Sequence, residues 1–143
     1  MTKSIQIALL VLLLFQVGCS KQDRAFKKLS GIWHLTEYRY RTLEGFNYYL
    51  DASGEIFFEN CDGGLCAYSM NITYSHPKLT GTRDEAGAFT VNDDAGVVSI
   101  IPYDISNNPE PTKKHTVMLL TKTEVKFEYV DDLGYAHYYL FER

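Results

Sequence analysis

From Ile32 onward the chain consists of short runs in which apolar and polar residues alternate. In the clearest run, 66–74, every second residue is apolar or aromatic, and the residues between them are small or polar. This period of two is typical of strands that bury one side and expose the other, as antiparallel sheets allow. Turn-forming residues divide the pattern into a series of predicted strands: 31–42, 46–51, 55–61, 66–75, 88–92, 97–101, 115–121, 125–130 and 135–142. No amphipathic helix of useful length is expected after Leu29.

Most of these predicted strands follow one another through tight turns, which favours an antiparallel up-and-down meander. A meander of eight or nine strands either closes on itself or leaves exposed edges that invite aggregation. The sequence therefore predicts an all-β fold in which residues 29–143 form one small closed barrel, with a flattened sandwich as the alternative. Because consecutive hairpins alternate between ends, the long connections 76–87 and 102–114 are expected at one end and the short turn 43–45 at the other.

The beginning of the chain has a different character. Lys3 precedes the apolar run 7–15, and smaller residues come just before Cys19. This layout predicts a secretory signal peptide over residues 1–18. The apolar run is shorter than the roughly 18 residues that a transmembrane helix needs, so we expect no permanent transmembrane span.

The junction between Gly18 and Cys19 resembles the lipobox of bacterial lipoproteins. The resemblance implies that Cys19 carries fatty acids such as palmitate and becomes the first residue of the mature chain. Two or more acyl chains hold a protein on a membrane durably. The protein is therefore expected to be lipid-anchored in the cell envelope, and Ser20 after the cysteine favours the outer membrane. An ordinary secretory signal with an unmodified cysteine is the alternative.

Residues 19–28 are polar and mostly basic, and we expect them to form a tether with at most one helical turn. A solvated tether is favoured over one whose cations contact anionic lipid headgroups. The whole chain has a formal net charge of −4, which becomes more negative when Lys3 is lost with the signal peptide. This acidic balance argues against a nucleic-acid partner, which would need a basic face.

Two short segments at the ends of the predicted barrel carry a family resemblance. Residues 29–33, Leu-Ser-Gly-Ile-Trp, are similar to the Gly-x-Trp signature that opens lipocalins. Residues 139–143 resemble the last strand of the compact lipocalin-like (calycin) domains of bacterial lipoproteins. The resemblance implies that Trp33 plugs one end of the barrel beneath Arg143, joined to it by a cation–π contact.

Barrels of this size enclose either packed side chains or one small ligand. If a cavity exists, we expect four residues to give it apolar walls with a few hydroxyls: Tyr68, Met70, Phe127 and Tyr129. The first functional hypothesis is therefore an anchored module that binds a small apolar molecule at the cell envelope. The alternative is a non-catalytic interaction or accessory protein with a filled core. Such a protein would meet its partner, or a carbohydrate, through exposed tyrosines: Tyr48, Tyr49 and Tyr138.

Cys61 and Cys66 bracket a four-residue turn. With Cys19 acylated, these two cysteines remain in an oxidising compartment, which favours a disulfide over free thiols, a metal pair or a redox switch. The four histidines are scattered without metal-ligand spacing, and neither a Gly-x-Ser-x-Gly elbow nor a glycine-rich phosphate loop is present. The sequence therefore predicts no enzyme activity, no catalytic residues, no metal site and no cofactor.

Overall fold

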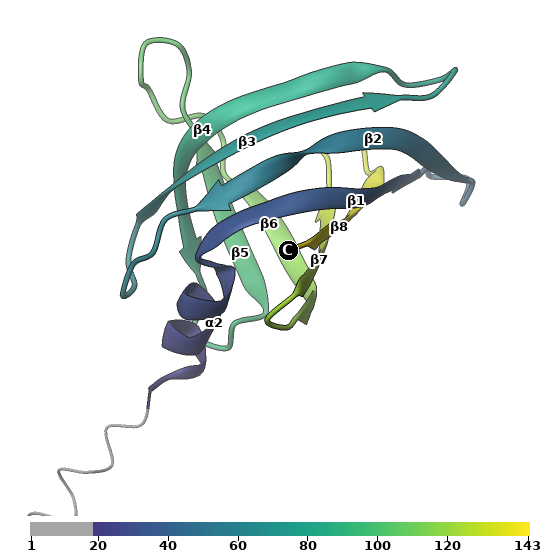
Figure 1. Cartoon of the computed structure of the whole chain (residues 1–143). Coiled ribbons are helices and arrows are strands. Elements are labelled where there is room, and N and C mark those ends of the chain that lie inside the picture. The colour runs from purple at the N-terminus through teal and green to yellow at the C-terminus, as the bar shows by residue number, and fades with distance from the viewer. Residues whose placement is uncertain (1–18) are drawn as a thin grey trace, which may run out of the picture.

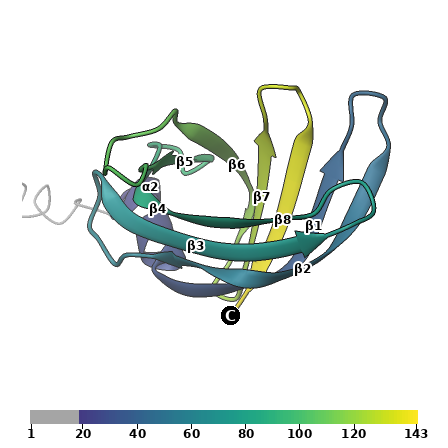
Figure 2. The ribbon, with the colours of Figure 1, turned by 90° about the horizontal axis from the view of Figure 1, so that it is seen from above.

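The computed structural model describes residues 19–143, so the predicted signal peptide, residues 1–18, lies outside the described residues. Eight antiparallel strands follow one another around a closed barrel, and a short helix precedes them (Figure 1). The elements are α2 (Lys21–Leu29), β1 (Gly31–Arg41), β2 (Asn47–Phe58), β3 (Cys66–Ser75), β4 (Gly81–Val91), β5 (Val97–Pro102), β6 (Lys113–Leu120), β7 (Glu124–Val130) and β8 (Ala136–Glu142). Figure 2 shows the strands curving around a common interior. The pairing of β8 with β1 closes the ring and confirms the predicted fold class.

β2 joins two segments that the sequence analysis separates, 46–51 and 55–61. Between them lies Gly54, which has a φ of 130° and belongs to the strand instead of a turn. A side chain at this position would collide with the backbone of Asn71 and Ile72 in β3, so the glycine marks a close approach of two strands. The division into nine separate strands is corrected for this reason, and the barrel has eight strands, one of the two numbers that the sequence predicts.

β4 begins at Gly81, whereas the sequence analysis starts this strand at residue 88. The period of two is present in the missed part, but its inward-facing members are Arg83 and Glu85. Because these residues are charged, the alternation of apolar and polar residues that reveals other strands is missing here. The expected connection 76–87 is correspondingly shorter and covers only 76–80.

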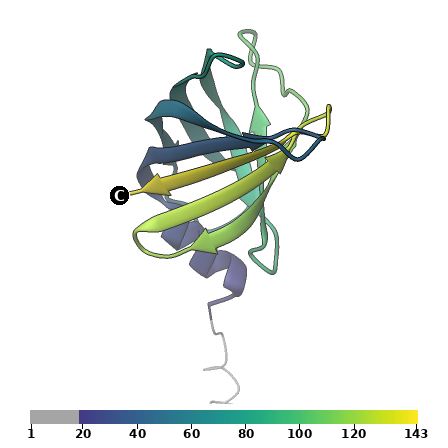
Figure 3. The ribbon, with the colours of Figure 1, turned by 90° about the vertical axis from the view of Figure 1, so that its right-hand side faces the viewer.

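The merging of two predicted strands also changes which connections share an end of the barrel. Four connections lie at one end, termed the open end: 42–46, 76–80, 103–112 and 131–135. Three others lie with α2 at the opposite end, termed the base: 59–65, 92–96 and 121–123. The expectation that the turn after β1 lies opposite the longer connections is therefore wrong. The helix and the extended connection 103–112 are at opposite ends (Figure 3).

α2 corrects the expectation that residues 19–28 form a solvated tether. The Ser20 hydroxyl accepts a hydrogen bond from the Asp23 N–H at 3.0 Å, and the Asp23 carboxylate accepts one from the Ser20 N–H at 2.9 Å. This capping box starts the helix. The apolar residues of the helix are buried against the base of the barrel: Ala25, Phe26 and Leu29. Phe26 and Leu29 are three positions apart and Ala25 and Leu29 are four apart, which places all three on one face of the helix. These three residues are enough to dock the helix.

A disulfide between Cys61 and Cys66 closes the loop after β2, as the sequence analysis expects. The Cα atoms of the two residues are 6.2 Å apart, at the base of the barrel. Cys19 is a free, exposed cysteine that directly precedes the helix cap. No helix among residues 19–143 is long and apolar enough to span a membrane.

Candidate ligand-binding site

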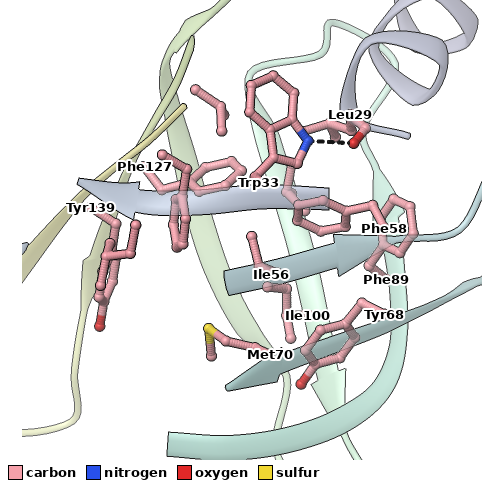
Figure 4. Close-up of a cluster of buried hydrophobic side chains, with 14 of the residues drawn as sticks. Leu29, Trp33, Ile56, Phe58, Tyr68, Met70, Phe89, Ile100, Phe127 and Tyr139 are labelled. Atoms are coloured by element: carbon pink, nitrogen blue, oxygen red, sulfur yellow. Dashed lines mark hydrogen bonds between the residues drawn. The ribbon is translucent and has the colours of Figure 1, made fainter. Parts of the chain in front are cut away.

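Aromatic side chains fill the half of the barrel next to the base. The ring of Phe58 lies edge-on to that of Phe89, with ring centres 4.8 Å apart. Phe26 of α2 contacts Phe89 from the helix side, at 5.6 Å between ring centres. The indole N–H of Trp33 donates to the Leu29 carbonyl at 2.6 Å (Figure 4). Because these side chains are fully buried, this half of the barrel is packed core.

Arg143 fastens α2 to the packed half. Its guanidinium lies over Trp33, with 4.1 Å between Cζ and the ring centre, which is the arrangement that the lipocalin resemblance implies. Its N–H groups also donate, at 2.7 to 2.8 Å, to three backbone carbonyls: those of Lys28, Ser30 and Lys122. The base is therefore closed both by the aromatic core and by this arginine.

Polar aromatic residues line the half of the barrel next to the open end. The rings of Tyr38 and Tyr139 stack with their centres 4.6 Å apart. The Tyr38 hydroxyl donates to His137 Nδ1 at 2.8 Å, and His137 Nε2 donates to the Asp131 carboxylate at 3.0 Å. This assignment follows from the negative charge on Asp131. Burial alone would raise the pKa of Asp131, but hydrogen bonds from His137 and from backbone N–H groups hold that pKa below its usual value.

Arg83, Glu85 and Lys113 form a charged cluster in the same half. Arg83 Nη2 lies 2.6 Å from one Glu85 oxygen, and Lys113 Nζ lies 2.7 Å from the other. Arg83 Nη1 also donates to the Tyr139 hydroxyl at 2.7 Å. Burial would raise the pKa of Glu85, but the charges of Arg83 and Lys113 outweigh this effect and lower that pKa. The cluster thus holds two cations and one carboxylate.

A groove of about 590 Å³ opens beside this cluster. It exists because β5 pairs with β4 only along residues 87–91 and ends at Pro102, which leaves the first half of β4 without a strand on that side. The connection 103–112 bounds the groove and extends beyond the barrel wall (Figure 1). The charged cluster lines the groove together with apolar residues from the other wall: Pro102, Tyr103 and Ile105.

An enclosed cavity of about 10 Å³ lies deeper in the barrel. A space of this size holds about one water molecule. Arg83 lines both the cavity and the groove. The remaining walls of the cavity are mostly apolar: Ile56, Met70, Ile100, His115, Phe127, Tyr139 and Phe141.

All four predicted ligand-binding residues lie on the inner side of the barrel wall, and three of them are buried. Met70 and Phe127 line the enclosed cavity, and Tyr68 is buried with them. The Tyr68 hydroxyl has no hydrogen-bond partner among residues 19–143. Both this hydroxyl and that of Tyr139 point away from Leu29, towards the open half (Figure 4). The fourth residue, Tyr129, is half-buried.

His115 is a buried polar residue on the inner side of β6. Its ring stacks on Tyr129 at 5.0 Å between centres, and its Nδ1 lies 3.3 Å from the Lys113 carbonyl oxygen. Burial, reinforced by the charge of Arg83, lowers the pKa of His115 to about 4. The imidazole is therefore neutral at pH 7.

The sequence analysis misses Arg83, Glu85 and Lys113, the residues that distinguish the open half chemically. Residues 82–86 read Thr-Arg-Asp-Glu-Ala, so three charged side chains follow one another directly. A run of consecutive charged residues usually indicates a solvated segment and gives no reason to place any of them inside a barrel.

The predicted surface tyrosines do not form one patch. Tyr49 is 63% exposed and shares the Arg39 guanidinium with Tyr138, at 5.9 and 4.2 Å from Arg39 Cζ to the two ring centres. Tyr48 stacks instead on Tyr40, 5.1 Å away between ring centres. Successive residues of a strand face opposite sides, so Tyr48 and Tyr49 are separated by the barrel wall.

Comparison with protein-family models finds no match, and comparison with curated proteins finds none. Among solved structures, a redesigned β-barrel matches with 15% identity and a TM-score of 0.54, covering 84% of this chain and 95% of its own. A second redesigned β-barrel, bound to DFHBI, matches with 15% identity and a TM-score of 0.54, covering 81% of this chain and 99% of its own. A de novo designed fluorescence-activating β-barrel has 12% identity, a TM-score of 0.49 and coverages of 83% and 96%. At these identities, the likeness to the two redesigned barrels shows the fold alone.

Proposed function

We propose that this protein is a non-catalytic module of the cell envelope that binds a small, largely apolar molecule. The groove of about 590 Å³ supports this most directly, because small-molecule sites have volumes of roughly 300–1,000 Å³. The second redesigned barrel is bound to a small molecule, DFHBI, which fits the proposal. In this proposal the apolar part of the ligand lies against Pro102, Tyr103 and Ile105. The enclosed cavity behind Arg83 is too small to hold more than water.

The proposal includes a lipid anchor on Cys19. This residue is exposed and directly precedes the N-cap of α2, and the helix is docked on the base of the barrel. Acyl chains on Cys19 would therefore hold the base next to the membrane, with almost no flexible chain between them. The open end and its groove would then face away from the bilayer.

A filled barrel that serves as an interaction protein is the second candidate, and one observation favours it. The enclosed cavity measures only about 10 Å³, so side chains occupy nearly all of the interior around it. A partner would then contact the outer face, where Tyr49 and Tyr138 share the Arg39 guanidinium. Aromatic residues and arginine are the residue types that contribute most binding energy in protein interfaces.

Native mass spectrometry of the protein purified from a bacterial host tests these proposals. We expect a non-covalent molecule that stays with the folded protein and is lost on denaturation. The denatured chain should begin at Cys19 and carry fatty acids, and a Cys19→Ser variant should lack them. A folded protein that carries no such molecule, together with a crosslink from the Arg39 surface to another protein, would favour the second candidate. An unmodified Cys19 would remove the anchor from the proposal.

A further inference from the structure

We propose that the groove beside β4 takes a small organic anion with one carboxylate, bound by Lys113 and Arg83. This inference rests on the proposed function and names the class of ligand. The apolar body of the anion lies along Pro102, Tyr103 and Ile105, which line the same groove as the two cations.

The first argument is the charge of the cluster. Two cations surround a single carboxylate, so one positive charge is left without a partner inside the cluster. The side chains of Arg83, Glu85 and Lys113 are only 18%, 12% and 25% exposed, so water screens this charge incompletely. A single carboxylate would neutralise this three-residue cluster without displacing Glu85.

The second argument is the number of unused hydrogen-bond donors. An ammonium group has three N–H donors and a guanidinium has five. Among residues 19–143, Lys113 Nζ donates to Glu85, Arg83 Nη1 donates to Tyr139, and Arg83 Nη2 forms an ion pair with Glu85. Donors therefore remain on both cations, and charge-assisted bonds to a carboxylate are about twice as strong as neutral ones.

Tyr68 adds a third, independent observation. Its side chain is 98% buried, and its hydroxyl has no partner among the residues that the structure describes. Burial is the main reason that the pKa of this hydroxyl is raised, and smaller effects come from the charges of Glu85, Arg83 and Glu110, all of which line the groove. A buried O–H without an acceptor costs free energy. Tyr68 is not itself among the residues that line the groove, so only a ligand oxygen that reaches behind the charged cluster, or a water molecule held there by the ligand, would relieve that cost.

The rim of the groove limits the charge of the ligand. Asp84, Asp104 and Glu110 also line it and repel anions. The Asp104 carboxylate already accepts hydrogen bonds from the backbone N–H groups of Ser106 and Asn108, at 2.9 and 2.8 Å. We therefore expect one carboxylate to bind at the cations, and a second negative charge to gain nothing because it meets the acidic rim.

Calorimetric titration of the purified mature protein tests this inference with three matched probes. They are 4-phenylbutyrate, its neutral analogue 4-phenylbutanamide, and the dianion phenylsuccinate. We expect the monoanion to bind about tenfold or more tightly than the amide, and the dianion to bind no more tightly than the monoanion. The preference for the anion should weaken as salt is added.

The variant that tests the role of the cluster is Lys113→Met. Lys113 is the most exposed member of the cluster, and Arg83 and Glu85 remain paired without it. This change should abolish the preference for the monoanion over the amide. Lys114→Met is the matched control, since Lys114 is exposed on the opposite face of β6 and should leave the preference unchanged. Circular dichroism of both variants checks that the barrel is folded.

Two results would overturn the inference and separate it from the proposed function. Equal affinities for the acid and the amide, unchanged in Lys113→Met, would show that the groove binds apolar molecules without regard to charge. If neither probe binds, the molecule found by native mass spectrometry decides. If that molecule is an anion, the inference is supported. If it is neutral, the inference is overturned but the proposed function stands. If the protein carries no molecule, the inference and the proposed function are both overturned.

Discussion

The two halves of the barrel use the same strands for different kinds of side chain. Next to the base, β4 contributes Phe89 and Val91, which are fully buried in the aromatic core. Towards the open end, the same strand contributes Arg83 and Glu85, which lie in a charged cluster beside the groove. Burial of apolar surface stabilises a fold strongly, whereas half-buried ion pairs contribute little net stability because desolvation offsets their attraction. Stability is therefore concentrated near the base, and the charged side chains of the proposed ligand site are concentrated near the open end.

The largest expected effect is the loss of stability when an aromatic ring near the base is removed. Phe58→Ala should lower the free energy of unfolding by about 3–5 kcal/mol, because it leaves a cavity against Phe89 and Phe127. Urea denaturation measures the change. Tyr49→Ala, on the outer face, is the control and should cost no more than about 0.5 kcal/mol. Equal losses in the two variants would contradict the view that the core near the base dominates stability.

The next effect is the pH dependence that His115 gives to the free energy of unfolding. Its pKa is about 4 in the folded protein and about 6.5 in an unfolded chain, so the unfolded chain binds a proton first as the pH falls. The contribution of neutral His115 to stability is fully present above pH 6.5 and is lost as the pH falls towards 4. Between these values the free energy of unfolding should decrease by about 2–3 kcal/mol.

His115→Gln should flatten this pH dependence, and His34→Gln, at an exposed position in β1, should not. Glu85 and Asp131 have lowered pKa values, so their contributions are present above their usual pKa and are lost only at more acid pH. Above pH 4.5, the pH dependence of the free energy of unfolding is therefore expected to come from His115. An unchanged slope in His115→Gln would mean that the open half admits enough water to keep this imidazole close to its usual pKa.

The smallest expected effect is at the start of α2. Ser20→Ala removes the side chain that caps the helix and should cost about 1 kcal/mol. Hydrogen exchange of the first turn of α2 should increase, while exchange in the strands of the barrel should not. Ser106→Ala, at an exposed position in the connection 103–112, is the control. No change in exchange at the first turn would show that packing of Phe26 alone holds the helix on the base.

The sequence reveals the elements whose inward faces are apolar, and it hides those whose inward faces are charged. The strand 66–75 is predicted with its observed bounds because Tyr68, Met70 and Ile72 alternate with small or polar residues. The first half of β4 is missed because Arg83 and Glu85 face inwards. Gly54 misleads for a different reason, since the sequence contains no information about how closely β3 approaches it.

The same contrast applies to the candidate site. Tyr68, Met70 and Phe127 are correctly placed in the interior because their apolar character predicts burial. The cluster of Arg83, Glu85 and Lys113 depends on the register between β4 and the chain after β5, which brings together residues far apart in the sequence. Local patterns do not determine that register, so the groove becomes visible only in the folded chain.

The seam between β1 and β8 joins the two strands that lie farthest apart in the described chain, and this has a consequence for how the protein is made. During synthesis β1 emerges before β8, so a sheet that forms from the first strands has an unpaired edge on each side. Neither edge is covered until β8 arrives, and contacts between such distant segments form slowly. Open edges of this kind recruit other chains. We therefore expect the yield of active protein to depend on how long that seam stays open, and less on how tightly the finished barrel is packed.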